Sequence, residues 1–407
     1  MVVRSHVSDF GVFTAVVATA ASLGLGIWGC GDPTGADLPE GSEVQWERDG
    51  FYGALAIGPD GTGYSRPLAA EEVFSIDPDT GETGWSFTPD ESVGQELTVG
   101  ADGTVYSYFD DDSIVALDGS DGSELWVSDP VTGELETDLA IGDGYIVAAS
   151  DNDDLYAFDL EDGSELWRLG FEDGLDDPVV GYDDLVHVAI DDTLYGVDAG
   201  GDDAEAEVEW SAELGADAEY ELTIGADGTV YVFNDVNISA IDGQSGEERW
   251  TETVIESSDA HSRMVIDEAG ILYFMAGGFH SGHDLVGVDT EDGQETFRVE
   301  LDMRVEHTFT PAVADNGIIY VGTWKRLSED YGTLVAIDTD RQQEAWRLDI
   351  EADVRMTLVD DNGDVWAGGP FSQAPGELVR VSTEADGPAD APWTMHRGNP
   401  QKSASVE

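Results

Sequence analysis

The chain has 407 residues, of which 88 are aspartate or glutamate and 16 are lysine or arginine, so its formal net charge is −72. Such a surface repels nucleic-acid phosphates and anionic lipid headgroups, which excludes nucleic-acid binding and direct electrostatic binding to membranes. Hydrophobic residues make up 41% of the chain, and Gly (49) is abundant, a composition typical of a packed core of short strands joined by tight turns.

The acidic residues are spread over the whole chain rather than gathered in one tail. In a compact protein they repel one another at ordinary ionic strength, whereas at molar salt the Debye length falls to about 3 Å and this repulsion is screened. We therefore predict a protein adapted to high salinity. A soluble acidic exported protein is the alternative.

The first 29 residues have the features of an export signal. Arg4 precedes residues 10–29, which are all apolar or small, and Gly29 is followed by Cys30. This ending resembles the lipobox of bacterial lipoproteins, in which the cysteine is acylated and becomes the new N-terminus. Cys30 is also the only cysteine, so an internal disulfide is impossible.

We therefore predict a lipoprotein signal peptide over 1–29, lipid attachment at Cys30 and an acidic linker over 30–43. If bacterial sorting rules apply, Gly31 carries no retention signal for the inner membrane, so the outer membrane is favoured. A plain signal peptide and an uncleaved membrane anchor are the alternatives.

Large aromatic residues recur along the chain at intervals of 39 to 49 residues. Ahead of most of them lies an apolar run that ends in aspartate, then a turn with glycine, as in Asp77, Gly81 and Trp85. The apolar run predicts a strand buried on both faces, the aspartate accepts hydrogen bonds from turn amides, and the glycine adopts a positive φ. The aromatic ladder consists of Trp46, Trp85, Trp126, Trp167, Trp210, Trp250, Phe297, Trp346 and Trp393.

A second pattern precedes each copy of the first. Two apolar runs flank an Asp-Gly or Asn-Gly pair, as at 97–106 and 222–231, which predicts a strand, a tight turn and a second strand. Eight such hairpins open near Ala54, Leu97, Leu139, Pro178, Leu222, Met264, Pro311 and Met356.

Two hairpins per repeat predict one four-stranded antiparallel sheet. Eight such sheets arranged radially form an all-β, eight-bladed β-propeller over residues 44–400, followed by a tail at 401–407. A strand from one end of the chain has to close the ring. Trp46 precedes the first full repeat and Trp393 follows the last, and both remain candidates for that strand.

This repeat resembles that of the pyrroloquinoline quinone (PQQ)-like propeller family, which includes quinoprotein alcohol dehydrogenases and the lipoprotein BamB of the outer-membrane β-barrel assembly machinery. The resemblance spans about residues 44–400 and includes the segment from Trp393 to Gln401. In this family the tryptophans dock between neighbouring blades. The resemblance therefore implies that the aromatic ladder builds the fold and does not bind a ligand.

In a four-stranded meander, the connections after the second and fourth strands lie on one face of the ring, here called the loop face. The turns after the first and third strands lie on the other, the turn face. Connections after the second strand have three or four residues in blades three to five but are longer at 276–284, 323–333, 369–377 and 66–72. Long loops on a rigid scaffold are common binding sites.

Histidines and cations concentrate in the same sector of the loop face. On a surface that is otherwise negative, we predict that they attract an acidic or aromatic protein partner. Salt bridges to the acidic coat are the alternative. The candidate partner-binding residues are His261, Arg263, His280, His283, Arg304, His307, Trp324, Lys325, Arg326 and Arg355.

Two kinds of motif raise metal binding. His280, His283 and Asp284 offer ligands suited to zinc or copper, but no further ligand elsewhere in the chain can be named. The acidic runs 110–112, 151–154 and 360–364 lack the full spacing and closing glutamate of a calcium loop, which favours solvated acidic loops. We predict no metal site.

The resemblance also raises catalysis with PQQ. Methanol dehydrogenase-type members carry a vicinal disulfide over the cofactor, which a chain with Cys30 alone cannot form. No nucleophile with an adjacent base and no phosphate-binding loop is evident. We therefore favour a non-catalytic, monomeric envelope scaffold that binds proteins without a cofactor, and the resemblance implies a BamB-like role in outer-membrane protein assembly. A PQQ-dependent oxidoreductase is the alternative.

Overall fold

The computed structural model contains strands and no helix among the residues that it describes. None of these residues forms a helix long and apolar enough to cross a membrane. The predicted signal peptide, Cys30 and the tail at 401–407 lie outside the described residues. The structure describes residues 38–39, 42–50, 52–67, 72–89, 93–94, 97–135, 138–172, 174–181, 185–200, 206–215, 218–234, 236–254, 263–277, 283–301, 311–323, 332–350, 352–369, 376–385 and 387–389.

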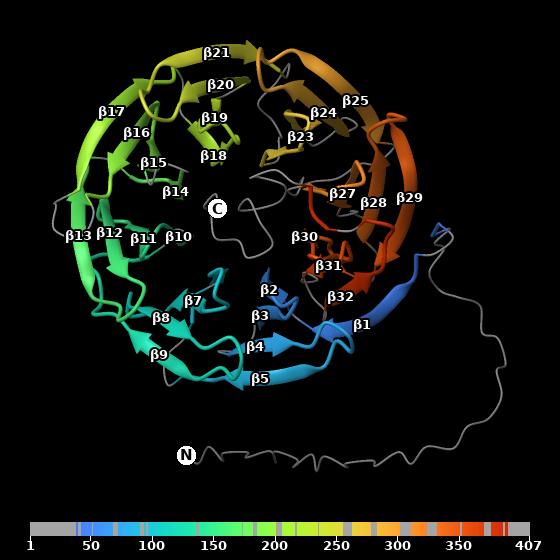
Figure 1. Ribbon diagram of the computed structural model, residues 1–407, viewed down its shortest axis with the longest axis horizontal. Coiled ribbons are helices and arrows are strands. Elements are labelled where there is room, and N and C mark those ends of the chain that lie inside the picture. The colour runs from blue at the N-terminus through green and yellow to red at the C-terminus, as the bar shows by residue number, and fades with distance from the viewer. Residues whose placement is uncertain are drawn as a thin grey trace, which may run out of the picture. The chain divides into compact units, whose positions relative to one another are not determined.

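The strands form eight four-stranded antiparallel sheets, which are the eight blades of a β-propeller (Figure 1). The predicted all-β, eight-bladed fold is confirmed. From the innermost strand to the outermost, the first four blades are β2 (Tyr52–Ile57), β3 (Gly63–Pro67), β4 (Val73–Ile76) and β5 (Thr83–Phe87); β6 (Thr98–Val99), β7 (Val105–Tyr108), β8 (Ile114–Leu117) and β9 (Glu124–Val127); β10 (Ala140–Ile141), β11 (Tyr145–Ser150), β12 (Asp154–Asp159) and β13 (Glu165–Gly170); and β14 (Val179–Val180), β15 (Leu185–Ile190), β16 (Thr193–Asp198) and β17 (Glu207–Glu213).

The other blades follow the same order, except that the last combines the two ends of the described chain. They are β18 (Ala218–Ile224), β19 (Thr229–Asn234), β20 (Asn237–Asp242) and β21 (Glu248–Thr253); β22 (Val265–Ile266), β23 (Ile271–Gly277), β24 (His283–Asp289) and β25 (Glu295–Leu301); β26 (Ala312–Val313), β27 (Ile318–Thr323), β28 (Gly332–Asp338) and β29 (Gln343–Ile350); and β30 (Met356–Val359), β31 (Val365–Gly369), β32 (Gly376–Val381) and β1 (Val44–Gly50).

Strand β1 closes the ring. It pairs antiparallel with β32, with Trp46 opposite Arg380 and Gly50 opposite Gly376. The strand that carries Trp46 is therefore the outermost strand of blade 8, and the ring is closed by residues that lie more than three hundred positions apart in the chain. Trp393, the other candidate, lies outside the described residues.

The turns between the third and fourth strands form as the repeat predicts. In blade 1, Oδ1 of Asp77 accepts hydrogen bonds from the backbone N–H groups of Asp79 (3.0 Å) and Thr80 (2.9 Å). Gly81 then adopts a φ of +69°, a conformation that costs glycine little. In blade 5, Asp242 receives the same kind of bond from Ser245 at 3.0 Å. The aspartate thus fixes the turn that leads into the outermost strand in blades 1 and 5.

Burial follows strand position within a blade. Every residue of β8 and β11 is buried, whereas β9 on the outer rim buries Trp126 and exposes its other three residues. The core therefore lies in the spaces between neighbouring blades, and the outermost strands present one of their faces to solvent.

Candidate functional site: grooves between neighbouring blades

Five of the blades are joined to the next by an indole hydrogen bond from the tryptophan of the outermost strand. The indole N–H of Trp85 donates to the carbonyl of Gly119 in blade 2 (2.8 Å), and the hydroxyl of Tyr64 donates to the same carbonyl (3.1 Å). A methyl group added at Gly122 would lie 2.4 Å from the Trp85 ring, so this ring packs directly on the turn of the next blade. The equivalent indole bonds join Trp46 to Pro78, Trp126 to Leu160, Trp210 to Gly243 and Trp250 to Thr290.

These joints assign five tryptophans of the ladder to the fold, and the hydrophobic core contains Trp167, Phe297 and Trp346. The joint made by Trp46 is part of the same series, because its indole N–H donates to the Pro78 carbonyl at 2.7 Å and its ring packs on Gly81. Ring closure thus uses the contact that is repeated at the other joints. A functional site has to be sought in departures from this pattern.

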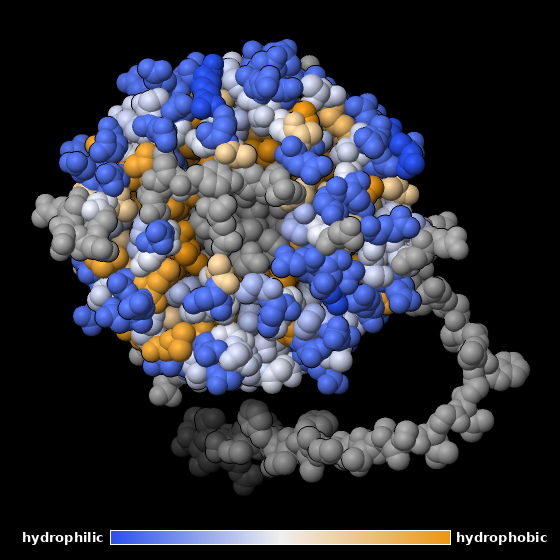
Figure 2. Space-filling view, in the orientation of Figure 1, coloured by the Kyte–Doolittle hydropathy of each residue, from blue (hydrophilic) through white to orange (hydrophobic). Residues whose placement is uncertain are grey.

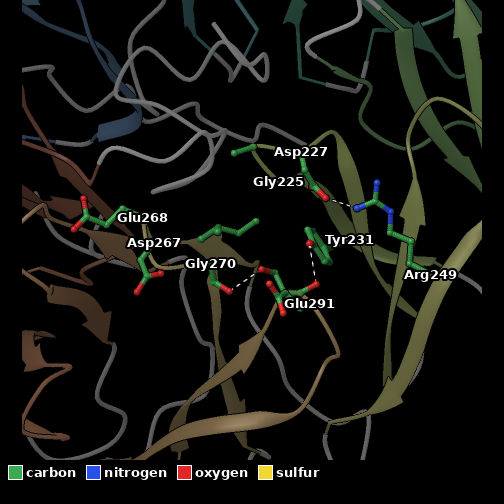
Figure 3. A pocket seen from close by; sticks show the side chains of 11 residues that line it. Gly225, Asp227, Tyr231, Arg249, Asp267, Glu268, Gly270 and Glu291 are labelled. Carbon is green, nitrogen blue, oxygen red and sulfur yellow. Dashed lines mark hydrogen bonds and ion pairs between the residues drawn. The ribbon is translucent and has the colours of Figure 1, made fainter.

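A groove of about 450 Å³ lies on the turn face between blades 5 and 6, beside the joint made by Trp250 (Figure 3). Arg249 of β21 lies on the blade 5 side, where it forms ion pairs with Asp227 and, at 2.9 Å, with Asp242. The hydrogen bond from Arg249 lowers the pKa of Asp242, and it raises the pKa of Arg249 itself. Both groups of this pair therefore stay ionised at neutral pH.

The blade 6 side of this groove is acidic. Asp267, Glu268 and Glu291 line it, and Oδ2 of Asp267 accepts a hydrogen bond from the hydroxyl of Tyr273 at 3.0 Å. Burial, with the Asp227 charge nearby, raises the pKa of Tyr231 in this groove to about 12. Because its tyrosine stays protonated and the Arg249–Asp242 pair stays charged, this groove is suited to holding charge rather than to moving protons at neutral pH.

A second groove, of about 400 Å³, lies on the turn face between blades 3 and 4 and is more apolar. Its side walls come from β13 and from the turns of both blades. Leu166 is 46% exposed, whereas Trp167 and Tyr145 beside it are buried. The groove is lined by Asp143, Gly144, Tyr145, Asp159, Leu160, Glu161, Leu166, Trp167, Asp198, Ala199 and Gly200.

Two local departures from the repeat accompany this groove. In blade 3 the second-strand position that faces the third strand at Ala157 is Val147, whereas the other seven blades carry an aromatic ring there. The turn that ends blade 4's third strand is also enlarged, since β16 ends at Asp198 and β17 begins at Glu207. The first change removes an aromatic ring from blade 3, and the second lengthens the turn of blade 4 beside the groove. The aromatic residues at the Val147 position are Tyr64, Tyr106, His187, Tyr231, Tyr273, Tyr320 and Trp366.

A family model described as "Outer membrane protein assembly factor BamB" matches the chain over residues 69–168, 121–278 and 281–406. The chain belongs to the BamB family. No curated protein sequence matches it. The BamB family model covers most of the propeller, from the end of β3 onward.

Solved structures share the fold of this BamB-family chain. BamB from Moraxella catarrhalis is 11% identical, with a TM-score of 0.63 over 84% of this chain and 100% of that one. The computationally designed Ika8 protein is 16% identical (TM-score 0.63; 82% and 98%). The quinohemoprotein alcohol dehydrogenase ADHIIG from Pseudomonas putida HK5 is 13% identical (TM-score 0.64; 86% and 77%). At these identities the similarity shows the fold alone.

Of the predicted partner-binding residues, Arg263, His283 and Arg355 lie in the described part of this BamB-family chain. Arg355 is exposed beside the end of β31, and its guanidinium lies 3.3 Å from Asp353. His283 is the first residue of β24 and only 1% exposed, so its imidazole is not part of an open surface. His261, His280, Arg304, His307, Trp324, Lys325 and Arg326 lie outside the described residues, so the predicted face as a whole stays a prediction.

The described residues contain no group of three or more histidine, cysteine, aspartate or glutamate side chains that could hold a metal ion. Asp284 of the His280 motif pairs with Arg298 at 2.6 Å. Two of the acidic runs also form ion pairs within the chain: Asp154 pairs with Arg168, and Asp360 pairs with Arg380. Asp360 is fully buried, so the expectation of a solvated loop is wrong at this position.

Two features were not anticipated from the sequence. The grooves lie on the turn face, whereas loop length predicted a binding site on the loop face. The second feature is the buried Arg380, which binds Asp360 (2.8 Å), Asp364 (2.9 Å) and the Pro78 carbonyl (2.8 Å) where the ring closes. Val147 and the long turn after Asp198 were visible signals for the blade 3–4 groove, but nothing in the sequence around Arg380 indicates burial.

Proposed function

We propose that the protein is a non-catalytic cell-envelope lipoprotein whose propeller binds other proteins during outer-membrane protein assembly. Membership of the BamB family supports the class of function. Lipid attachment at Cys30 after export would hold the propeller at the membrane, with the outer membrane as the favoured site. The high net charge favours a monomer, because two copies of a chain with a net charge of −72 repel each other.

The observation that carries this proposal is the exposure of large apolar side chains on the outer strands of three consecutive blades. Leu125 and Val127 of β9, Leu166 of β13 and Val208 of β17 are between 38% and 51% exposed. In Figure 2, apolar residues are exposed over blades 2 and 3, although much of the surface in view is hydrophilic. Exposed apolar groups that gather in one sector of a charged surface favour contact with another protein.

The alternative is a PQQ-dependent oxidoreductase. Its support is the similarity in fold to a quinohemoprotein alcohol dehydrogenase. PQQ is a tricarboxylate, so a site for it needs cations. The innermost strands β2, β6, β10, β14, β18, β22, β26 and β30 carry no lysine, arginine or histidine. These strands do not fit the cofactor, and we derive no reaction through it.

Titration calorimetry and affinity purification separate the two functions. The full chain, folded in molar KCl, is titrated with PQQ and Ca²⁺ while dye-linked alcohol oxidation is followed. We expect no binding and no turnover. Affinity purification from salt-adapted membranes is expected to recover envelope proteins with the wild type. Micromolar PQQ binding together with alcohol oxidation would overturn the scaffold function.

The predicted loop-face residues are tested in the same purification. Replacing Lys325, Arg326 and Arg355 with glutamate reverses the charge of that sector. Loss of the recovered partners would support a role for the loop face. Unchanged recovery would exclude the loop face as the contact surface. The turn-face grooves and the exposed apolar side chains of β9, β13 and β17 would then remain.

A further inference from the structure

The groove between blades 3 and 4 combines an apolar floor with an acidic rim. Leu160, Leu166 and Ala199 contribute apolar surface, and Tyr145 and Trp167 close the bottom. The lining contains no lysine, arginine or histidine. Its carboxylates are Asp143, Asp159, Glu161 and Asp198, of which all but Asp159 are exposed.

The carboxylates on the rim are fixed in place by the turns that carry them. Oδ1 of Asp159 accepts a hydrogen bond from the backbone N–H of Glu161 (2.7 Å), and Oδ1 of Asp198 accepts one from Gly200 (2.8 Å). Among the described residues, the second oxygen of each carboxylate has no hydrogen-bond donor. Two negative groups are therefore held on opposite sides of the apolar floor, one on each blade.

Leu166 is unusual for its position in the repeat. The residue before the aromatic on the outermost strand is leucine only in blades 2 and 3, at Leu125 and Leu166. Both are exposed, at 51% and 46%, but only Leu166 lines the groove. The two leucines form a natural pair of test and control, because each follows a glutamate and precedes a buried tryptophan. In the other blades the position holds Gln45, Gly84, Glu209, Arg249, Thr296 or Ala345.

We propose that this groove binds a protein segment with one aliphatic or aromatic side chain flanked by lysine or arginine. The inference rests on the proposed function and names the chemistry of the partner. The apolar anchor covers Leu166 and Leu160, and the flanking cations lie against the carboxylates of the rim. A volume of about 400 Å³ falls within the range of roughly 300–1,000 Å³ that is common for concave binding sites.

Charge complementarity selects this occupant over the others that an apolar groove could take. A second copy of the chain would bring more carboxylates to the same rim, since acidic residues outnumber basic ones 88 to 16. Anionic lipid headgroups meet the same repulsion. A basic segment with an apolar anchor can pack its anchor on the apolar floor and pair its cations with the carboxylates of the rim.

Three synthetic peptides test the chemistry on the full chain. The first has a central tryptophan flanked by lysines, the second replaces the lysines with glutamates, and the third replaces the tryptophan with serine. Binding is measured by fluorescence anisotropy of a labelled peptide in about 2 M KCl and at the lowest KCl concentration at which circular dichroism shows the folded chain. We expect the first peptide to bind best, with the serine peptide about tenfold weaker at both salt concentrations.

The salt dependence separates the anchor from the charges. The advantage of lysine over glutamate should be largest at the lower KCl concentration and shrink in about 2 M KCl, because salt screens exposed charges. Equal binding of the lysine and glutamate peptides at the lower concentration would overturn the role of the rim. Equal binding of the tryptophan and serine peptides would overturn the role of the floor.

Two matched variants locate the site. Leu166→Ser is expected to weaken binding of the lysine–tryptophan peptide about tenfold. Leu125→Ser, the same change one blade earlier, should leave binding of this peptide in the groove unchanged, because Leu125 is exposed but does not line the groove. Glu161→Gln should weaken binding at the lower KCl concentration only. Equal effects of the two leucine variants, or no effect of either, would overturn the groove. The proposed function then still stands if the Leu166→Ser chain recovers the same envelope proteins as wild type.

Discussion

The contact between Trp85 and Gly122 gives the sharpest test of how the blades are joined. Gly122 has a φ of +73°, and an added methyl group would lie 2.4 Å from the Trp85 ring. Gly228 has nearly the same φ, +76°, but no heavy atom within 4 Å of the added methyl. Alanine at either position costs about 1–2 kcal/mol for the left-handed backbone. At Gly122 the collision with the indole adds about 1–3 kcal/mol.

The free energy of unfolding of Gly122→Ala should therefore fall below that of Gly228→Ala by about 1–3 kcal/mol. It is measured by urea denaturation in molar KCl, with tryptophan fluorescence and circular dichroism followed together to check that the two transitions coincide. In a Trp85→Phe background the smaller ring leaves room, so the two alanine variants should become similar. Equal costs in the wild-type background would refute the docking of the tryptophan on the glycine turn.

The remaining predictions concern ring closure, pH and salt. Arg380→Met leaves the fully buried Asp360 without its cation and should lower the free energy of unfolding, measured in urea, by about 3–5 kcal/mol. Arg380→Met combined with Asp360→Leu should lower it less. Equal losses in the single and the double variant would contradict a buried ion pair. The Asp242 pKa lies below its usual 3.8 because of Arg249, so Asp242 stabilises the fold above about pH 4 and this stabilisation is lost as the pH falls through the lowered pKa. Arg249→Gln should flatten this acid-side loss, and an unchanged pH profile would contradict the pairing. The thermal midpoint should rise between about 0.1 and 2 M KCl because screening weakens the repulsion among carboxylates; a flat profile would contradict salt adaptation.

Local patterns were sufficient to predict the blades. The innermost strands of blades 2 and 3 begin at Thr98 and Ala140, next to the predicted openings at Leu97 and Leu139. The aspartate and glycine of each turn act within a few residues of one another, so their effect can be read from a short stretch of sequence. The repetition of these turns fixed the number of blades as well.

Long-range features could not be predicted in the same way. The pairing of β1 with β32 joins the two ends of the chain, and no local pattern distinguishes Trp46 from Trp393 as the closing aromatic. Burial of charged and polar side chains was also missed. Arg380 belongs to a residue type that usually faces solvent and His283 to one of intermediate burial, and the packing of neighbouring strands encloses both.

The predicted loop-face site stays a prediction, whereas the grooves among the described residues lie on the turn face. Loop length and cation content favoured the loop face, and most of the residues named there lie outside the described ranges. The blade 3–4 groove instead lies beside two departures from the repeat, Val147 in place of an aromatic ring and a longer turn after Asp198. The replacement of an aromatic residue by valine is harder to recognise in a sequence as a sign of a binding site than a cluster of cations in long loops.

The most direct test of the envelope-scaffold function is quantitative proteomics of the cell envelope after deletion of this protein. The levels of outer-membrane β-barrel proteins are expected to fall and to be restored by the wild-type chain. The Cys30→Ala chain, which lacks the predicted site of lipid attachment, should restore them poorly. Unchanged β-barrel levels after deletion, together with loss of a dye-linked alcohol oxidation activity, would contradict the scaffold function and favour the quinoprotein alternative.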